Sequence, residues 1–424
     1  MTATALLHPV LSAGSDTRDP AFALAEGKSL LEALDVEIQF AEPITLNKPV
    51  AGTFFGSGKI AELGSRFNAL ETDVVVINGQ ISPVQQRNLE RAWKVKILDR
   101  TALILEIFGD RARTREGVLQ VDLAHLTYQK SRLVRSWTHL ERQRGGGGFM
   151  GGPGETQIEA DRRAIDDAII RLKRQLGKVE KTRALHRAAR KKVPFPIVAL
   201  VGYTNAGKST IFNTLTGADV LAKDMVFATL DPTMRAIELP TGKRVILSDT
   251  VGFISDLPTQ LVAAFRATLE EVLDADLILH VRDIAHPETE RQADNVLSIL
   301  KELGVDQEAE NQMVDVWNKT DLLDNDSKLR AANTAMREPK VQMASALTGE
   351  GLPELLETIE TALTGTTLSE TVTLGSDAGK ARSWLYEQSV VRHEDMVDGD
   401  MAFQVVWNAK QRDQFHAHFG PVAS

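Results

Sequence analysis

The sequence predicts an α/β protein of several domains, with a doubly wound, mostly parallel sheet as its largest domain. Three features predict this fold class. Short apolar runs of strand length alternate with helical segments before residue 110 and again after residue 194. Between these regions, apolar residues recur at helical spacing along two long segments. The last segment contains the alternating stretch MAFQVVW at 401–407, which predicts a strand.

Changes in composition and periodicity divide the chain into five expected segments. They are a flexible tail at 1–25, a small α/β domain at 26–115, an antiparallel helical hairpin at 116–193, the doubly wound domain at 194–365 and a small α+β domain at 366–424. The second segment should hold helices at 29–33, after the stretch 54–59 through Phe67, from 83 onward and at 101–108, and strands at 35–40, 73–77 and 95–98. Gly56-Ser57-Gly58-Lys59 could cradle a phosphate, but a plain turn before a helix is the favoured interpretation.

The composition is that of an ordinary soluble protein of 424 residues, with 43% hydrophobic and 25% charged residues. Because the chain has no cysteine, disulfides and a thiolate zinc site are excluded. No apolar run has transmembrane length, and the first 16 residues lack the features of a signal peptide. We therefore expect a cytoplasmic protein without a membrane span, and we expect it to be a monomer.

The hairpin is expected from two apolar stripes with alternating spacing of three and four residues. The first contains Leu123, Leu126, Leu133, Trp137 and Leu140, and the second contains Ile158, Ile165, Ile169, Leu172, Leu176 and Val179. Between Asp110 and Lys192 there are 20 Lys and Arg against 10 Asp and Glu, in a chain of net charge −9. A basic middle in an acidic chain is either a nucleic-acid contact or a solvated helical surface.

A glycine-rich loop at 145–154 joins the two expected helices, and it contains more glycine than a turn requires. It is either a flexible linker or a segment that enters an RNA cavity. An apolar pair at its tip and flanking arginines favour the second interpretation. The expected RNA-contacting residues are Arg144, Gly145, Gly146, Gly147, Gly148, Phe149, Met150, Gly151 and Gly152.

The doubly wound domain begins with an apolar strand at 197–201, followed by the pattern Gly202-x4-Gly207-Lys208-Ser209. This is the P-loop pattern, in which glycines let backbone N–H groups surround phosphates. Lys208 should reach the β- and γ-phosphates, and the Ser209 hydroxyl should bind Mg²⁺. A strand at 244–249 then ends in Asp249-Thr250-Val251-Gly252, a DxxG motif that should contact Mg²⁺ through water and the γ-phosphate.

Two further strands, expected at 277–281 and 313–317, precede the motif Asn318-Lys319-Thr320-Asp321. The Asp321 carboxylate can accept hydrogen bonds from N1–H and N2 of guanine, a donor pattern that adenine lacks. A strand at 341–344 leads to Ser345-Ala346-Leu347, whose backbone should meet guanine O6. The motifs predict a P-loop fold that binds GTP and GDP.

The nucleotide-contacting residues expected from these motifs fall into four groups. They are Gly202, Tyr203, Thr204, Asn205, Ala206, Gly207, Lys208, Ser209 and Thr210; Phe227, Ala228, Thr229, Leu230 and Asp231; Asp249, Thr250, Val251 and Gly252; and Asn318, Lys319, Asp321, Ser345, Ala346 and Leu347. In the final segment, residues 382–391 could form a helix or a strand, and we assign no chemistry to His393, Glu394 and Asp395.

These residues resemble the HflX family of translation-associated GTPases. The resemblance rests on GYTNAGKST at 202–210, FATLD at 227–231, DTVGFI at 249–254 and NKTD at 318–321, and outside them on SGKIAEL at 57–63, SPVQQRNLE at 82–90, DRTALILEIF at 99–108 and GGGGFMGGPGETQIEADRR at 145–163. It implies GTP hydrolysis, binding to the large ribosomal subunit, and ribosome splitting or rescue under stress. It also implies that the glycine loop reaches the peptidyl-transferase region.

The resemblance further implies roles for single residues. Lys208, Thr229 and Gly252 would be catalytic, Ser209 and Thr229 would ligate Mg²⁺, and Asp249 would hold Mg²⁺ through water. Phe253 occupies the position where many GTPases place a water-orienting glutamine, so unaided hydrolysis should be slow. Asn205 resembles the asparagine of potassium-activated GTPases and is the one indication that K⁺ is a further cofactor.

Two other functions remain open from the sequence. One is an RNA-docking switch in large-subunit assembly that uses hydrolysis only for release. The other is ATP-dependent RNA remodelling by the N-terminal α/β domain, although no Walker or DExD pattern lies there.

Overall fold

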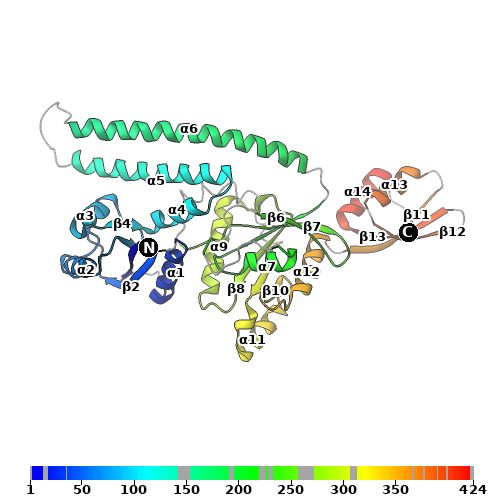
Figure 1. Ribbon diagram of the computed structural model, residues 1–424. Coiled ribbons are helices and arrows are strands. Elements are labelled where there is room, and N and C mark those ends of the chain that lie inside the picture. The colour runs from blue at the N-terminus through cyan, green and yellow to red at the C-terminus, as the bar shows by residue number, and fades with distance from the viewer. Residues whose placement is uncertain are drawn as a thin grey trace. The chain divides into compact units, whose positions relative to one another are not determined.

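The structure is a computed structural model, which describes residues 2–12, 18–34, 36–141, 153–190, 195–218, 226–227, 233–255, 272–305, 313–364, 367–375, 378–388, 390–397 and 400–420. The chain forms two compact units (Figure 1). The first unit comprises Met1–Ile237 and Val245–Glu350, and the second comprises Glu238–Arg244 and Gly351–Ser424. Within the described ranges, every helix is too short or too polar to cross a membrane.

The first unit begins with a four-stranded parallel sheet in the order β2-β1-β3-β4. Its strands are β1 (Ala3–Leu11), β2 (Glu37–Leu46), β3 (Val74–Ile77) and β4 (Lys96–Asp99). The expected strands at 35–40, 73–77 and 95–98 correspond to β2, β3 and β4, and β2 is longer than expected.

The expectation of a flexible tail at residues 1–25 is wrong. Strand β1 lies inside the sheet, between β2 and β3, and the side chains of Ala5, Leu6 and Leu7 are fully buried. Leu6 packs into one apolar cluster, whereas Ala5 and Leu7 pack into another, as the alternation of a strand requires. A continuous apolar run is the pattern of a strand buried on both faces.

Four helices accompany this sheet: α1 (Pro20–Glu32), α2 (Ser57–Ala69), α3 (Pro83–Trp93) and α4 (Arg100–Arg111). The short helix expected at 29–33 is the last part of α1, which begins earlier because Asp19 caps it and Pro20 occupies its first turn. Ser82 caps α3 through a complete capping box with Gln85, as the sequence predicts. Gly56 caps α2, and Lys59 pairs with Glu62 at 2.8 Å, as in a plain turn.

The helical hairpin is confirmed. Helices α5 (Arg115–Glu141) and α6 (Pro153–Arg190) lie side by side (Figure 1). The members of the second stripe from Ile165 to Val179 are half-buried, and Lys130 forms an ion pair with Asp166 across the seam. The glycine-rich loop falls largely within residues 142–152, outside the described residues.

A buried carboxylate fixes the middle of the first hairpin helix on the N-terminal sheet. Asp99, at the end of β4, accepts a hydrogen bond from the Tyr128 hydroxyl at 2.8 Å and pairs with Arg132, and both partners lie on α5. Its other contact caps α4 through the Ala102 N–H at 2.9 Å. The middle of α5 is therefore packed against the sheet.

The second sheet of this unit has the order β10-β9-β8-β5-β7-β6. It contains β5 (Ile197–Gly202), β6 (Thr233–Glu238), β7 (Arg244–Asp249), β8 (Leu277–Asp283), β9 (Val314–Asn318) and β10 (Val341–Met343). The pairs β5–β7, β5–β8, β8–β9 and β9–β10 are parallel, which confirms the expected doubly wound sheet. Helices α7 (Lys208–Thr216), α9 (Thr289–Leu303), α11 (Asn325–Ala335) and the 3₁₀ turn η1 (Thr320–Leu322) connect its strands.

The second unit contains α12 (Leu352–Thr364), β11 (Thr367–Leu374), α13 (Gly379–Glu387), β12 (Val391–Val397), β13 (Asp400–Asn408) and α14 (Ala409–Phe419). Its strands form an antiparallel sheet in the order β11-β13-β12 around buried Phe403, Trp407 and Phe415. The strand expected at 401–407 is confirmed as β13. The stretch at 382–391 divides between α13 and the start of β12, and residues 393–395 are exposed on β12.

Candidate nucleotide site

The P-loop leaves β5 and enters α7 along a path that only glycine permits at two positions. Gly202 has φ +153° and Gly207 has φ +97°. A Cβ on Gly202 would lie 2.2 Å from the Val281 carbonyl oxygen, and one on Gly207 would lie 2.1 Å from Nδ2 of Asn318. Asn205, at the exposed tip, adopts the left-handed conformation with φ 60°. The loop therefore forms the phosphate-binding turn that its sequence predicts.

The Lys208 ammonium lies inside this loop. Its Nζ donates hydrogen bonds to the carbonyl oxygens of Gly202 at 3.1 Å and Tyr203 at 2.8 Å. Burial lowers the pKa of Lys208 to about 8, while the nearby Asp249 carboxylate acts in the opposite direction. A buried cation with a lowered pKa gains most from a polyanion placed beside it.

This pKa predicts proton uptake when nucleotide binds. At pH 8 the amine of the free protein is partly deprotonated, and the phosphates of GDP should restore the missing proton, so GDP binding should be accompanied by proton uptake. Deprotonation of Lys208 should lower the affinity for GDP by up to roughly tenfold per pH unit above pH 8. Titration calorimetry at pH 8 in two buffers of different ionisation enthalpy measures the uptake. Equal heats in both buffers would contradict the lowered pKa.

The candidate magnesium residues lie together. The Ser209 hydroxyl, in the first turn of α7, donates a hydrogen bond to Oδ2 of Asp249 at 2.7 Å. Both offer oxygen atoms, which are the ligands that Mg²⁺ prefers, and Asp249 ends the neighbouring strand β7. The pair therefore fits a site in which one hydroxyl binds the ion directly and one carboxylate binds its water.

The DxxG segment lies against the P-loop. A Cβ on Gly252 would lie 3.1 Å from Nζ of Lys208, so this backbone already borders the expected γ-phosphate position. The next residue, Phe253, accepts a hydrogen bond from the Thr204 N–H at 2.7 Å and donates its own N–H to the Gly202 carbonyl at 3.1 Å. Phe253 is 1% exposed, and its side chain belongs to the apolar core of this unit. The Thr250 hydroxyl donates to the Leu200 carbonyl at 2.6 Å, and Val251 is buried.

The NKxD motif joins the P-loop to the segment after β10. Asn318 donates through Nδ2 to the Ala206 carbonyl at 2.8 Å and accepts the Ala346 N–H at 3.0 Å. The Ser345 hydroxyl donates to Oδ1 of Asp321 at 2.6 Å, which orients the carboxylate expected to bind guanine. Of the other residues expected to contact guanine, Lys319 forms an ion pair with Asp283 at 2.8 Å, and Leu347 is 80% exposed.

The structure thus brings three of the four expected groups to one edge of the sheet. In the remaining group, Phe227 is buried, and its ring centroid lies 4.5 Å from that of Phe108 of α4. The other members, Ala228, Thr229, Leu230 and Asp231, lie outside the described residues, as do Arg144 and the loop through Gly152. On α6, Arg162, Arg163, Arg171, Lys173 and Arg174 are all exposed.

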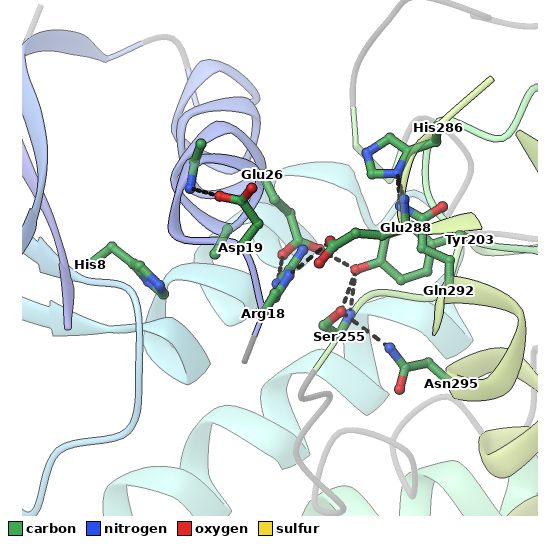
Figure 2. Close-up of polar contacts among 12 residues, drawn as sticks. His8, Arg18, Asp19, Glu26, Tyr203, Ser255, His286, Glu288, Gln292 and Asn295 are labelled. Atoms are coloured by element: carbon green, nitrogen blue, oxygen red, sulfur yellow. Dashed lines mark hydrogen bonds and ion pairs between the residues drawn. The ribbon is translucent and has the colours of Figure 1, made fainter. Parts of the chain in front are cut away.

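Sequence reasoning missed a polar cluster beside this site, in which the Tyr203 hydroxyl meets Glu26 of α1 and Ser255 (Figure 2). Arg18 and Arg100 pair with the same glutamate. The motifs identify Tyr203 only as a loop position. No spacing rule connects residues 26, 100, 203 and 255, because tertiary folding alone brings them together.

Four family models match consecutive parts of the chain. Models described as "GTP-binding GTPase N-terminal" and "GTP-binding GTPase Middle Region" match residues 22–109 and 111–190. A model described as "50S ribosome-binding GTPase" matches residues 197–319, and one described as "HflX C-terminal domain" matches residues 330–424.

Individual proteins match over most of their length. The chain is 42% identical to GTPase HflX of Escherichia coli strain K12 over 401 residues, 94% of this chain and 92% of that one. It is 55% identical to GTPase HflX of Magnetococcus marinus over 328 residues, 77% of this chain and 74% of that one. The crystal structure of the SsGBP–GDP complex shares the fold, with a TM-score of 0.50 and 24% identity over 86% of this chain and 99% of that one.

Proposed function

Because the chain belongs to the HflX family of GTPases, we propose that it binds the large ribosomal subunit and uses the GTP cycle to split or rescue ribosomes in the cytoplasm. One observation carries the proposal: a GTP site and a basic helical hairpin form parts of one compact unit. The model described as "50S ribosome-binding GTPase" matches most of the nucleotide-binding sheet and supports the choice of partner.

In the proposed cycle, the P-loop and Lys208 bind the phosphates, and Gly252 meets the γ-phosphate of GTP alone. Ser209 and Asp249 would hold Mg²⁺, with Thr229 as the further ligand that the motif implies. The ion would neutralise charge on the β- and γ-phosphate oxygens during hydrolysis. Asn205 would contact a potassium ion if the protein requires one, and its exposed position at the loop tip is compatible with that role.

The hairpin is the proposed contact with ribosomal RNA. The exposed arginines and lysines of α6 would pair with phosphates, and such contacts weaken as salt rises. Asp99 ties the middle of α5 to the sheet through Tyr128 and Arg132. A long hairpin that is packed against the N-terminal sheet is suited to place the glycine loop in the peptidyl-transferase region.

Replacement of Phe149-Met150 by Ser-Ser tests this proposal. The change removes two side chains from the tip of the loop, where a stacked ring would contribute roughly 1–3 kcal/mol. Subunit splitting should fall by at least tenfold, whereas folding and GDP binding should be unchanged. Pelleting with large subunits should fall less, because the basic helices remain. Splitting and pelleting are measured on the same preparation.

A second variant separates docking from splitting. Arg171→Gln with Arg174→Gln removes two exposed charges from α6, so pelleting and its salt dependence should both decrease. Arg330→Gln, which changes an exposed arginine on α11, is the matched control. Wild-type splitting by the Ser-Ser protein would make the glycine loop a linker. Strong pelleting without splitting by the unaltered protein would favour the docking switch in subunit assembly.

A further inference from the structure

A hydrogen-bonded cluster ties the segment that follows the DxxG motif to the N-terminal domain (Figure 2). Ser255, three residues after Gly252, donates its backbone N–H to the Tyr203 hydroxyl at 2.7 Å, and its own hydroxyl also lies 2.7 Å from that oxygen. The tyrosine hydroxyl in turn contacts Glu26 of α1. One oxygen atom on the P-loop therefore links the DxxG segment to a carboxylate outside the nucleotide-binding sheet.

The charges of the neighbouring groups determine which atom donates and which accepts in these hydrogen bonds. Burial disfavours an ionised Glu26, but Arg100 and Arg18 outweigh burial and hold the pKa of this carboxyl below its ordinary value. Burial, followed by the Glu26 carboxylate, raises the pKa of the Tyr203 hydroxyl, which keeps its proton. The hydroxyl thus donates to Glu26, and its lone pairs are left to accept from Ser255.

A second set of hydrogen bonds connects the N-terminal domain to the same serine. Arg100, at the start of α4, donates through Nη2 to the Ser255 carbonyl oxygen at 3.0 Å and to Glu26 at 3.0 Å. Its Nη1 donates to Oδ1 of Asn78 at 2.7 Å, at the end of β3. The N–H and the C=O of one residue are therefore both held by side chains that the N-terminal domain orients.

We propose that Tyr203, oriented by Glu26, is a positioning residue that keeps Gly252 beside Lys208, ready for the γ-phosphate of GTP. Three residues of chain span at most about 10 Å, so an anchored Ser255 restricts where Gly252 can move. Phe253 between them is already paired with the P-loop backbone. This inference depends on GTP binding at Lys208 and Gly252, and it is independent of the ribosome.

A comparison of the affinities for GTP and GDP distinguishes a positioning role of Tyr203 from a merely structural one. GDP lacks the phosphate that meets Gly252, so a positioning role affects GTP alone. A structural role would affect both nucleotides equally, because both use the P-loop that carries Tyr203.

Tyr203→Phe is the test, because it removes one hydroxyl and keeps the buried ring. The affinity for GTPγS should fall about five- to tenfold because the variant loses the buried hydroxyl that anchors Ser255, while the affinity for GDP stays within about twofold. Tyr128→Phe is the matched control, since it removes another buried tyrosine–carboxylate bond, to Asp99, away from the nucleotide site. Its ratio of the two affinities should equal that of the wild type.

A double-mutant cycle tests the participation of Glu26. Glu26→Gln keeps an acceptor oxygen but removes the charge, and its effect on GTPγS should not add to that of Tyr203→Phe. An unchanged ratio in Tyr203→Phe, an equal loss of both nucleotides, or additive effects in the double variant would each overturn the proposal. Failure of the wild type to bind either nucleotide would instead overturn the nucleotide site itself.

Discussion

Asp321→Asn is expected to abolish the preference for guanine nucleotides. The Ser345 hydroxyl holds Oδ1 of this carboxylate at 2.6 Å, so the group is oriented before nucleotide binds. An amide offers one acceptor oxygen in place of two, and its NH₂ would face the N–H groups of guanine. Loss of one charged hydrogen bond costs roughly 1.5–3 kcal/mol, so the affinity for GDP should fall at least tenfold.

The measurement compares GDP with XDP and GTP with XTP, because xanthine carries an oxygen where guanine carries its N2 amino group. The variant should gain relative affinity for the xanthine nucleotides. Asp324→Asn is the matched control, since Asp324 caps α11 through the Ser327 N–H at 2.7 Å and asparagine caps a helix equally well. If Asp321→Asn retains the wild-type affinity for GDP and gains none for XDP, the carboxylate does not bind the base.

The arrangement of the P-loop, DxxG and NKxD segments could be predicted closely because its information is local. A buried parallel strand appears as an apolar run, and the residue at its carboxyl end begins the functional loop. The strand expected at 244–249 matches β7 at both ends, and Asp249 is its last residue. The sequence did not predict that Asn318 connects the P-loop with Ala346, because its hydrogen bond to Ala206 joins residues that are 112 positions apart.

The sequence pattern of the N-terminal segment conceals strand β1 for a physical reason. Strand β1 contains His8 and Pro9, which interrupt an apolar run that is otherwise typical of a central strand. The carboxyl half of β1 pairs with β2 alone, because β3 is shorter and its last partner is Leu7, so the proline lies where pairing on one side has ended. The wrong assignment also hid the Arg18–Glu26 pair, since Arg18 was placed in the tail.

Large ribosomal subunits are expected to raise the GTP turnover of this protein by at least tenfold. The Phe253 ring is 1% exposed and packs in the core, and a phenyl ring cannot orient water by a hydrogen bond. Unaided hydrolysis should therefore be slow, on the order of the intrinsic rates of small GTPases or below. A partner that supplies the missing groups can raise such rates by up to about 10⁵-fold.

The activation is measured as phosphate release with large subunits, with small subunits and with neither. Arg171→Gln with Arg174→Gln should raise the concentration of large subunits needed for half-maximal activation and leave the basal rate unchanged, because both residues lie on α6. Phe253→Leu replaces the buried ring by another apolar side chain that cannot orient water. The ratio of the GTP turnover with large subunits to the turnover without them should therefore stay largely unchanged. Equal turnover with and without large subunits would exclude the ribosome as activator and would leave hydrolysis to groups of this chain alone.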